Sequence, residues 1–382
     1  MNILYATDFH NRANSGITFA VNELAGQAQV GLAPGGSVNL LSIGETDISI
    51  PPGVRHLTAP PSTGPMRLWR FASSYGPMCE AAIRREDVSI VHIHGLWMYP
   101  SFAAARAAQR QAIPTVLTNH GAIQWALRQP GSLGAAKKRL YMTLMKDRLL
   151  RKITVQHAIT QLDRDALFSV FPHGRIEVVP NFVDVRKVDK DLGSAEMPNS
   201  DPYVLFFGRL HPTKGVDVLI EAFDRAAIPR GWRLVIAGPA VDRSYSDRLR
   251  RLIAASPRAD RIELRGPVWE APEKYRLMRD AWVTVVPSHT EAISLVNLES
   301  SACRTPTITT RATGLTDWME GGGVLTEPAV GPLAAALSAS SCWSTSERMQ
   351  RGLLSRQLIE RRYSAGVVIP RWMDLYRSLH RS

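Results

Sequence analysis

Residues 203–216 have the sequence YVLFFGRLHPTKGV, and this stretch decides how the rest of the chain is interpreted. Its first five residues predict a buried strand, Gly208 permits a tight turn, and a helix is expected to begin near Val216. Arg209 and Lys214 stand five positions apart in the loop. Because a helix N-terminus favours anions, this strand–loop–helix unit predicts a diphosphate site. A solvated basic turn is the structural alternative. The pattern G-x-x-x-x-G-K-[ST] is absent, which excludes an ordinary P-loop NTPase.

Short apolar runs alternate with longer amphipathic segments on both sides of this stretch, which is typical of βα units and parallel sheets. In the first half, strands are expected at residues 2–6, 38–42, 88–94, 115–118, 153–158 and 176–179. Helices are expected between them, near residues 18–29, 67–85, 102–111 and 135–150. In the second half, strands are expected at residues 203–207, 233–237, 262–265, 282–286 and 307–309.

The length of 382 residues exceeds what one hydrophobic core usually supports, so two domains are expected. We place them at 1–184 and 203–362. The stretch 185–202 is charged, then polar, and ends in proline, so it predicts a linker. The remaining segment, 363–382, predicts a helix that either packs on its own domain or returns to the first one. One apolar face of this helix is formed by Trp372, Leu375, Tyr376 and Leu379.

The amino-acid composition indicates a globular protein that binds anionic partners. Hydrophobic residues make up 45% and charged residues 21% of the chain, as in soluble globular proteins. No apolar run predicts a spanning helix, and the first residues do not resemble a signal peptide, which indicates a cytoplasmic location. Cys79, Cys303 and Cys342 lie far apart and are expected to be free thiols. The net charge of +12 favours anionic partners such as nucleotides or phospholipids, and no nucleic-acid-binding motif accompanies it.

A second candidate site follows another predicted strand. Residues 287–299, PSHTEAISLVNLE, place Glu291 in a loop and Glu299 in the first turns of a helix. Carboxylates accept hydrogen bonds from sugar hydroxyls, and amides before a helix bind phosphate. Acids on a helix usually face solvent, but ligands of parallel sheets bind beyond the carboxyl ends of strands. This position therefore indicates a sugar–phosphate site.

These two motifs, with the Ala-Cys-x-x-Pro that follows Glu299, resemble family 4 of the retaining GT-B glycosyltransferases, of the bacterial polysaccharide type. Further elements resemble the same family in the same order: HIHGLW at 92–97, TNHG at 118–121, VPNFVD at 179–184 and the ending at 362–376. The resemblance runs from the first strand to the last helix and is strongest between residues 203 and 306. It implies an α/β GT-B fold, with two Rossmann-like doubly wound parallel-sheet domains facing a central cleft.

The resemblance also implies roles for individual residues. Arg209 and Lys214 would hold the donor diphosphate and neutralise the leaving group, and Glu299 would bind the ribose hydroxyls. Glu291 would contact the donor sugar, which His120 would face from the other domain. The other donor-binding positions that the resemblance implies are Gly16, Gly208, Ile293, Ser294 and Leu295. No metal or cofactor is expected, since the nucleotide sugar is itself a substrate.

The implied reaction moves a hexose-type sugar from a nucleotide-diphosphate donor, with retention, to a glycan or polyprenyl-linked acceptor in surface or exopolysaccharide biosynthesis. A sugar-nucleotide epimerase or hydrolase of the same fold is an alternative, as is a catalytically weak nucleotide-sugar-binding protein. An oxidoreductase is disfavoured because no G-x-G-x-x-G follows a strand. The family's usual glycines are replaced by Ala292, Ser294, Arg304 and Ser15, and we expect Ser294 to be able to cap its helix.

Three further features of the sequence are weaker indications of function. The segment from Lys137 to Lys152 contains seven Lys or Arg and one acid, and predicts either a helix that docks on an anionic membrane or an ordinary surface helix. His92 and His94 are expected on opposite faces of their strand, with His94 nearer the site. The D-x-D sequences that begin at Asp163 and Asp189 resemble a metal–nucleotide element of the other large glycosyltransferase fold, but are expected to be solvated charge.

Overall fold

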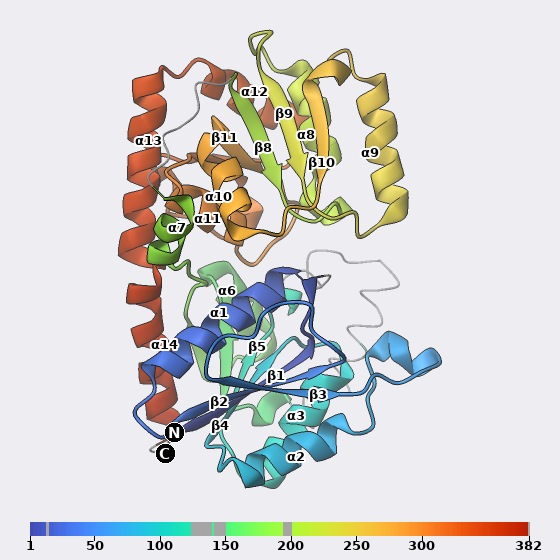
Figure 1. The fold of residues 1–382 in the computed structure, drawn as a ribbon, viewed down its shortest axis with the longest axis vertical. Coiled ribbons are helices and arrows are strands. Elements are labelled where there is room, and N and C mark those ends of the chain that lie inside the picture. Colours follow the sequence, from blue (N-terminus) through green and yellow to red (C-terminus); the bar gives the residue numbers. More distant parts are fainter. Residues whose placement is uncertain (13–14, 124–139, 141–149, 194–200, 381–382) are drawn as a thin grey trace. The chain divides into compact units, whose positions relative to one another are not determined.

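The computed structural model describes residues 1–12, 15–123, 140, 150–193 and 201–380. The chain divides into a first unit, Met1–Asn181 with Val368–Ser382, and a second unit, Phe182–Val367 (Figure 1). In the described residues, the first unit holds a seven-stranded sheet and the second a six-stranded sheet. All the strand pairs in both sheets are parallel, which confirms the predicted α/β class.

The first sheet has the order β3-β2-β1-β4-β5-β6-β7. Its strands are β1 (Asn2–Phe9), β2 (Ser37–Ile43), β3 (Val54–Ala59), β4 (Ile90–His94), β5 (Thr115–Thr118), β6 (Val155–Ala158) and β7 (Ile176–Val178). The helices of this unit are α1 (Ser15–Gly31), α2 (Tyr75–Arg85), α3 (Tyr99–Arg110), α6 (Gln161–Val170) and most of α14 (Ala365–His380). The strand order reverses between β1 and β4, so the ends of these strands form the switch point where such sheets bind ligands.

Six predicted strands of the first unit are confirmed to within a few residues, whereas β3 was not predicted. The helix expected at 67–85 was wrong in its first part, because a short 3₁₀ turn, Pro65–Trp69, precedes α2. The expected helix at 135–150 lies outside the described residues except for its positions 140 and 150.

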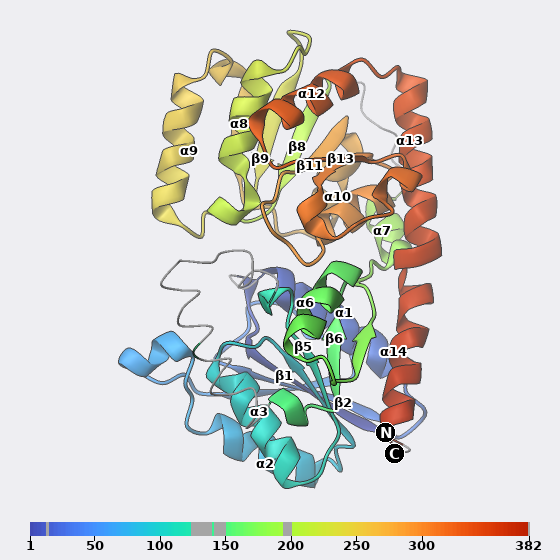
Figure 2. The ribbon, with the colours of Figure 1, turned by 180° about the vertical axis from the view of Figure 1, so that it is seen from behind.

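The second sheet has the order β10-β9-β8-β11-β12-β13. Its strands are β8 (Tyr203–Phe207), β9 (Arg233–Ala237), β10 (Ile262–Gly266), β11 (Val283–Val286), β12 (Thr307–Thr310) and β13 (Val324–Thr326). Its helices are α7 (Val185–Leu192), α8 (Val216–Arg225), α9 (Arg243–Ala255), α10 (Ala271–Asp280), α11 (Leu295–Ala302), α12 (Val330–Ser341) and α13 (Thr345–Leu358). The helices α8 and α12 pack side by side (Figure 2). The five predicted strands are confirmed, and β13 was not predicted.

The stretch that we expected to be a linker begins with helix α7. Asp184 caps this helix by accepting hydrogen bonds from the backbone N–H groups of Arg186 and Lys187. Asp189 on α7 pairs with Arg356 of α13 at 2.7 Å. These contacts attach the first part of the stretch to the second unit.

The C-terminal helix α14 packs on one face of the first sheet. Alternation along the strands places Leu4 and Ile93 in the apolar core with α2 and α3, so Tyr5 and His92 lie on the opposite face. There the Tyr376 hydroxyl lies 2.9 Å from the Tyr5 hydroxyl and 2.8 Å from His92 Nδ1. The predicted apolar face is buried in full at Trp372, Leu375, Tyr376 and Leu379.

The contact between α14 and the sheet continues as a chain of hydrogen bonds whose direction can be derived. The Val179 carbonyl can only accept, so His157 donates to it from Nε2 at 2.8 Å. The Nδ1 of neutral His157 therefore accepts from the Thr118 hydroxyl. That hydroxyl must then accept from His92 Nε2, which leaves His92 Nδ1 to accept from Tyr376. With both imidazoles neutral, every member of the chain therefore has a partner.

We expect acidification to destabilise the first unit selectively. Burial lowers the pKa of six of its histidines: to about 4 for His10 and His120, to about 3 for His157, below the usual range for His56, and well below that range for His92 and His94. The unfolded chain binds these protons near pH 6.5 and the folded chain does not. Stability is therefore lost as the pH falls below about 6.5, by up to about 1.4 kcal/mol per pH unit for each histidine.

One buried acid in the same unit acts in the opposite direction. Burial raises the pKa of Asp163 to about 6, so below that pH the folded state holds a proton that the unfolded state releases, and this stabilises the fold. One acid cannot offset six histidines. Calorimetry is carried out from pH 7.5 to 5.0, and proteolysis assigns each transition to a unit. The melting temperature of the first unit should fall more than that of the second unit as the pH is lowered. The second unit, whose histidines are half-buried or exposed, is the internal control; equal shifts in both units would contradict the expectation.

Candidate active site

The loop between β8 and α8 carries the two predicted cations, Arg209 and Lys214, and is packed tightly by backbone contacts. Gly208, at its start, has φ of +149°. A Cβ atom added to Gly238 in the neighbouring loop would lie 1.8 Å from the Gly208 carbonyl oxygen. Two glycines thus allow the loops after β8 and β9 to touch, which places the cations at the carboxyl edge of the second sheet.

Lys214 and Glu291, predicted from separate motifs, are in direct contact. Lys214 Nζ lies 2.6 Å from Glu291 Oε1, and the side chains are 19% and 15% exposed. The Ser288 hydroxyl donates to Glu291 Oε2 at 2.9 Å. Backbone pairing supports this contact, since the His289 N–H donates to the Thr213 carbonyl at 2.9 Å. The loops after β8 and β11 therefore form one site.

Arg209 differs from Lys214 in that it has no hydrogen-bond or ion-pair partner among the residues that the structure describes. It is half-buried, at the start of the same loop. The pKa of nearby His211 is lowered by burial and by the charge of Arg209. A half-buried guanidinium that lacks a protein acid can bind an anionic ligand.

Helix α11 begins next to Glu291. Its N-cap is Ser294, with φ of −85°, so this position does not require the glycine that the family pattern has. The expectation about capping was wrong, because the Ser294 hydroxyl makes no hydrogen bond to the helix. The side chains of Ala292, Ile293 and Ser294 are buried. In the first turn the Asn297 N–H donates to the Ser294 carbonyl at 3.1 Å. The N–H groups before it lack helical acceptors and favour an anion.

Arg304, which replaces another usual glycine, keeps the backbone conformation that glycine favours, with φ of +60°. The backbone is crowded here, since a Cβ on Gly352 would lie 2.1 Å from the Arg304 carbonyl oxygen. A left-handed conformation costs a non-glycine residue about 1–2 kcal/mol. The surrounding packing thus holds the loop after α11 despite the substitution.

Glu299 contacts a residue that the sequence analysis did not select. Its Oε1 lies 2.7 Å from Nζ of Lys274, in the first half of α10, and both side chains are 19% exposed. No hydrogen bond joins Glu299 to Lys214 or Glu291 in the described residues. The predicted residues of the second unit therefore form two groups, and Lys274 belongs to the second. The only signal for it was a lysine near the start of a helix at the carboxyl edge.

In the first unit, His120 follows β5 with an unusual backbone φ of +53°. Its Nε2 lies 3.2 Å from Nδ1 of His94, which ends β4. The rings of His92 and His94 have centroids 4.1 Å apart. The expectation that they face opposite sides was wrong, because residues two apart in a strand share a face. Gly16 lies in the first turn of α1, where an added Cβ would meet nothing within 4 Å.

The prediction that Asp163 is solvated was also wrong, because its side chain is fully buried. Thr160 caps α6, and this places Asp163 in the first turn. There its carboxylate accepts hydrogen bonds from the Ile159 N–H at 3.1 Å and from Asn119 Nδ2 at 3.4 Å. It thus fixes the backbone next to His120. Asp189 is half-exposed but ion-paired.

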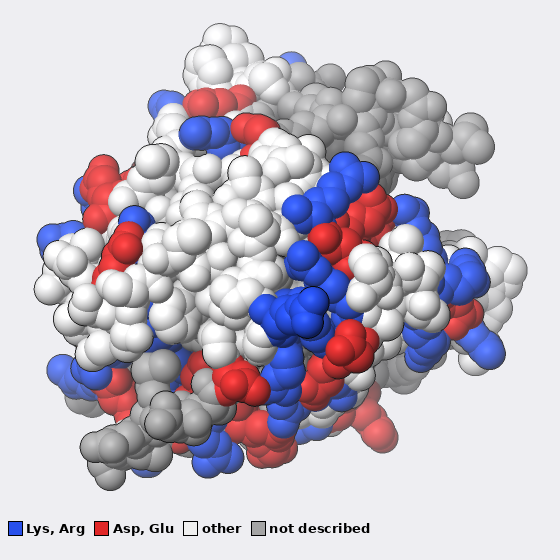
Figure 3. Space-filling view, turned by 90° about the horizontal axis from the view of Figure 1, so that it is seen from above, with Lys and Arg blue, Asp and Glu red and all other residues white. Residues whose placement is uncertain are grey.

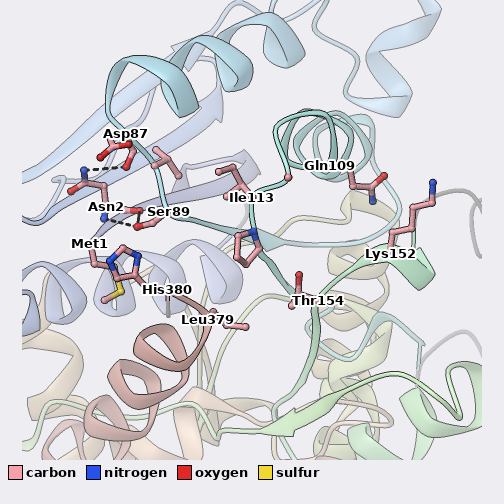
Figure 4. A pocket seen from close by; sticks show the side chains of 13 residues that line it. Met1, Asn2, Asp87, Ser89, Gln109, Ile113, Lys152, Thr154, Leu379 and His380 are labelled. Atoms are coloured by element: carbon pink, nitrogen blue, oxygen red, sulfur yellow. Dashed lines mark hydrogen bonds between the residues drawn. The ribbon is translucent and has the colours of Figure 1, made fainter. Parts of the chain in front are cut away.

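A cavity of about 660 Å³ lies at the other edge of the first sheet (Figure 4). Its lining includes residues at or before the starts of β1, β4, β5 and β6, such as Asn2, Ser89, Pro114 and Thr154, and residues at the ends of α3 and α14. None of the predicted site residues lines it. It is therefore separate from the candidate active site.

The described part of the chain has no group of three or more His, Cys, Asp or Glu side chains placed to hold a metal ion. Within the same part, none of the helices combines the length and the apolar character that a membrane span requires. The three cysteines are free. The segment from Lys137 to Lys152 lies outside the described residues except at 140 and 150–152.

Two parallel-sheet α/β units, with cations and acids on the loops that follow the strands of the second, define a protein of the GT-B class. Residues 31–181 match the family model "Glycosyl transferase 4-like domain", and residues 188–338 match "Glycosyl transferases group 1". The two ranges together span most of both units. The chain belongs to family 4 of the GT-B glycosyltransferases.

Individual relatives agree with this assignment. The chain is 32% identical over 255 residues to the D-inositol 3-phosphate glycosyltransferase of Acidothermus cellulolyticus, a match that covers 61% of this chain and 54% of the relative. It is 29% identical to that of Xylanimonas cellulosilytica over 70% of this chain and 68% of the relative. The chain thus spans between half and about two thirds of the length of these relatives.

Solved structures share the fold across the whole chain. Sucrose-phosphate synthase from Thermosynechococcus elongatus has a TM-score of 0.80 at 19% identity and covers 99% of both chains. Anabaena HepE in complex with UDP-glucose has a TM-score of 0.74 at 17% identity and covers 99% of this chain and 100% of its own. At these identities the similarity establishes the fold alone.

Proposed function

We propose that this protein is a retaining glycosyltransferase that transfers a hexose-type sugar from a nucleotide-diphosphate donor. The observation that carries the proposal is the contact of Lys214 with Glu291. Arg209, which has no partner among the described residues, lies on the same loop as Lys214, and α11 begins shortly after Glu291. This arrangement gathers two cations, helix N–H groups and a carboxylate at one sheet edge. A sugar diphosphate needs cations and amides at one end and hydroxyl acceptors at the other.

The proposed reaction uses these groups as follows. The bond between the anomeric carbon and the diphosphate oxygen breaks, and negative charge develops on the leaving diphosphate. Arg209 and Lys214 stabilise that charge, and Glu291 accepts hydrogen bonds from the donor sugar. The acceptor oxygen bonds to the anomeric carbon on the same face, and its proton passes to the leaving phosphate. No metal or other cofactor is part of this proposal.

The acceptor that we propose is a glycan or a polyprenyl-linked sugar, in surface or exopolysaccharide assembly. The names of the relatives add D-inositol 3-phosphate as a candidate. In Figure 3, Lys and Arg atoms lie together with Asp and Glu atoms beside a broad uncharged area of the face shown. If the basic segment from Lys137 to Lys152 docks on membranes, the protein should sediment with anionic liposomes at low but not high salt.

A donor screen tests the proposed activity. UDP-, GDP-, ADP- and dTDP-sugars are offered with each candidate acceptor, and nucleotide release and glycosylated product are measured together. The neighbour crystallised with UDP-glucose makes UDP-sugars the first choice. We expect one donor to give product with a retained anomeric configuration. Release without acceptor would indicate a hydrolase, and binding without turnover would indicate a nucleotide-sugar-binding protein.

A further inference from the structure

The contact between α10 and α11 contains a lysine–glutamate pair that the proposed mechanism does not use. Lys274 Nζ lies 2.7 Å from Glu299 Oε1 and 4.5 Å from the ring centroid of Tyr275. Each of the paired side chains is only about one-fifth exposed. Glu299 Oε2, by contrast, has no hydrogen-bond partner among the described residues. The pair therefore leaves one carboxylate oxygen for another donor.

A lone glutamate is a poor receptor for a ribose diol, because it has three rotatable bonds that binding must fix. Ordering such a side chain costs about 0.5–1.5 kcal/mol when it occurs on binding. A fully exposed ion pair would not remove that cost, since it is weak and mobile. The pair between Lys274 and Glu299 is shielded on both sides, and the packing of α10 against α11 holds its two backbones. The carboxylate is thus ordered before a ligand arrives.

We propose that Lys274 is a positioning residue for nucleotide recognition, which holds the Glu299 carboxylate ready to accept hydrogen bonds from the ribose hydroxyls of the donor. This inference rests on the proposed function and on the role that the family resemblance implies for Glu299, which is to bind the ribose hydroxyls of the donor. It adds a residue that no motif selected. It also predicts that Lys274 affects recognition of the ribose hydroxyls but not of the base or the diphosphate.

The test compares ribonucleoside diphosphates with their 2′,3′-dideoxy forms. UDP, GDP, ADP and CDP, each beside its dideoxy counterpart, are titrated calorimetrically into the full chain and into Lys274→Met. Hydrogen bonds to a charged group should make the wild type prefer the ribose form at least about tenfold. In Lys274→Met we expect this preference to fall to within about threefold, with the dideoxy affinity unchanged. Lys274→Arg should retain part of the preference.

Two variants separate positioning from other effects. Arg276→Met removes one positive charge from an exposed position of the same helix and should leave both affinities unchanged. In a Glu299→Gln background, Lys274→Met should have no further effect on the preference. The inference is overturned if Lys274→Met keeps the wild-type preference, or if it weakens both nucleotide forms equally. If the wild type binds none of the four nucleotides, the proposed function fails, and this inference fails with it.

Discussion

Replacing either Arg209 or Lys214 by alanine is expected to lower turnover at least about a hundredfold. Both cations lie on the loop after β8, and Lys214 is held against Glu291. In the proposed reaction they meet the charge that develops on the leaving diphosphate. Removing one such preorganised contact costs about 3 kcal/mol in the transition state, which corresponds to about two orders of magnitude in rate. The measurement is kcat with the donor and acceptor that the screen identifies.

Two controls distinguish this role from a structural one. Arg225→Ala removes a positive charge from the exposed end of the same βα unit and should keep full activity. Lys214→Ala also leaves Glu291 without its partner, so the double variant Lys214→Ala/Glu291→Gln is needed. Glu291→Gln alone is the reference, because Glu291 also contacts the donor sugar in the proposed reaction. If Lys214 acts on the diphosphate, the double variant stays well below Glu291→Gln alone. If its only task is to neutralise Glu291, the double variant matches Glu291→Gln, and the diphosphate assignment is wrong.

The sequence predicted the parts of the fold that depend on local pattern. Continuous apolar runs such as 203–207 and 233–237 gave strands with the observed bounds, because both faces of a central parallel strand are buried. The strand β3 was not predicted because polar residues interrupt its apolar pattern, VRHLTA, and β13 was not predicted because it has only three residues. Helix α7 was not predicted because it is charged along most of its length and buries only Val188.

The sequence predicted the site residues that lie within motifs. It did not predict the residues whose role depends on packing between elements that are far apart in the chain. Lys214 and Glu291 were selected from separate loops, and the structure brings them together. Lys274 could not be selected, because its contact with Glu299 arises only when α10 packs against α11. Asp163 was misjudged for a similar reason: spacing along the chain does not show that a capped helix turns this carboxyl toward Asn119. Contacts between elements are set by tertiary structure, which local patterns do not encode.

Gly215→Ala is expected to impair both the stability of the second unit and its activity. Gly215 has φ of +67° and precedes α8 directly after Lys214. An added Cβ would lie 2.3 Å from the carbonyl oxygen of Pro287, a backbone atom of the loop that carries Glu291. The left-handed conformation costs about 1–2 kcal/mol and the forced shift about 1–3 kcal/mol more. We expect the second unit to melt about 10 °C lower, and turnover to fall because Lys214 and Glu291 are pushed apart.

Two other glycines of the same unit separate the causes of that loss. Gly231→Ala adds a methyl group where nothing lies within 4 Å and φ is not positive, so melting should barely change. Gly266→Ala meets no atom within 4 Å either, but φ there is +86°, so it isolates the conformational cost. Calorimetric melting of all three variants should place Gly215→Ala lowest, because it alone combines strain with a backbone clash. If Gly215→Ala melts with Gly266→Ala and keeps normal turnover, then the two loops are not packed as described, and the single site built from them must be abandoned.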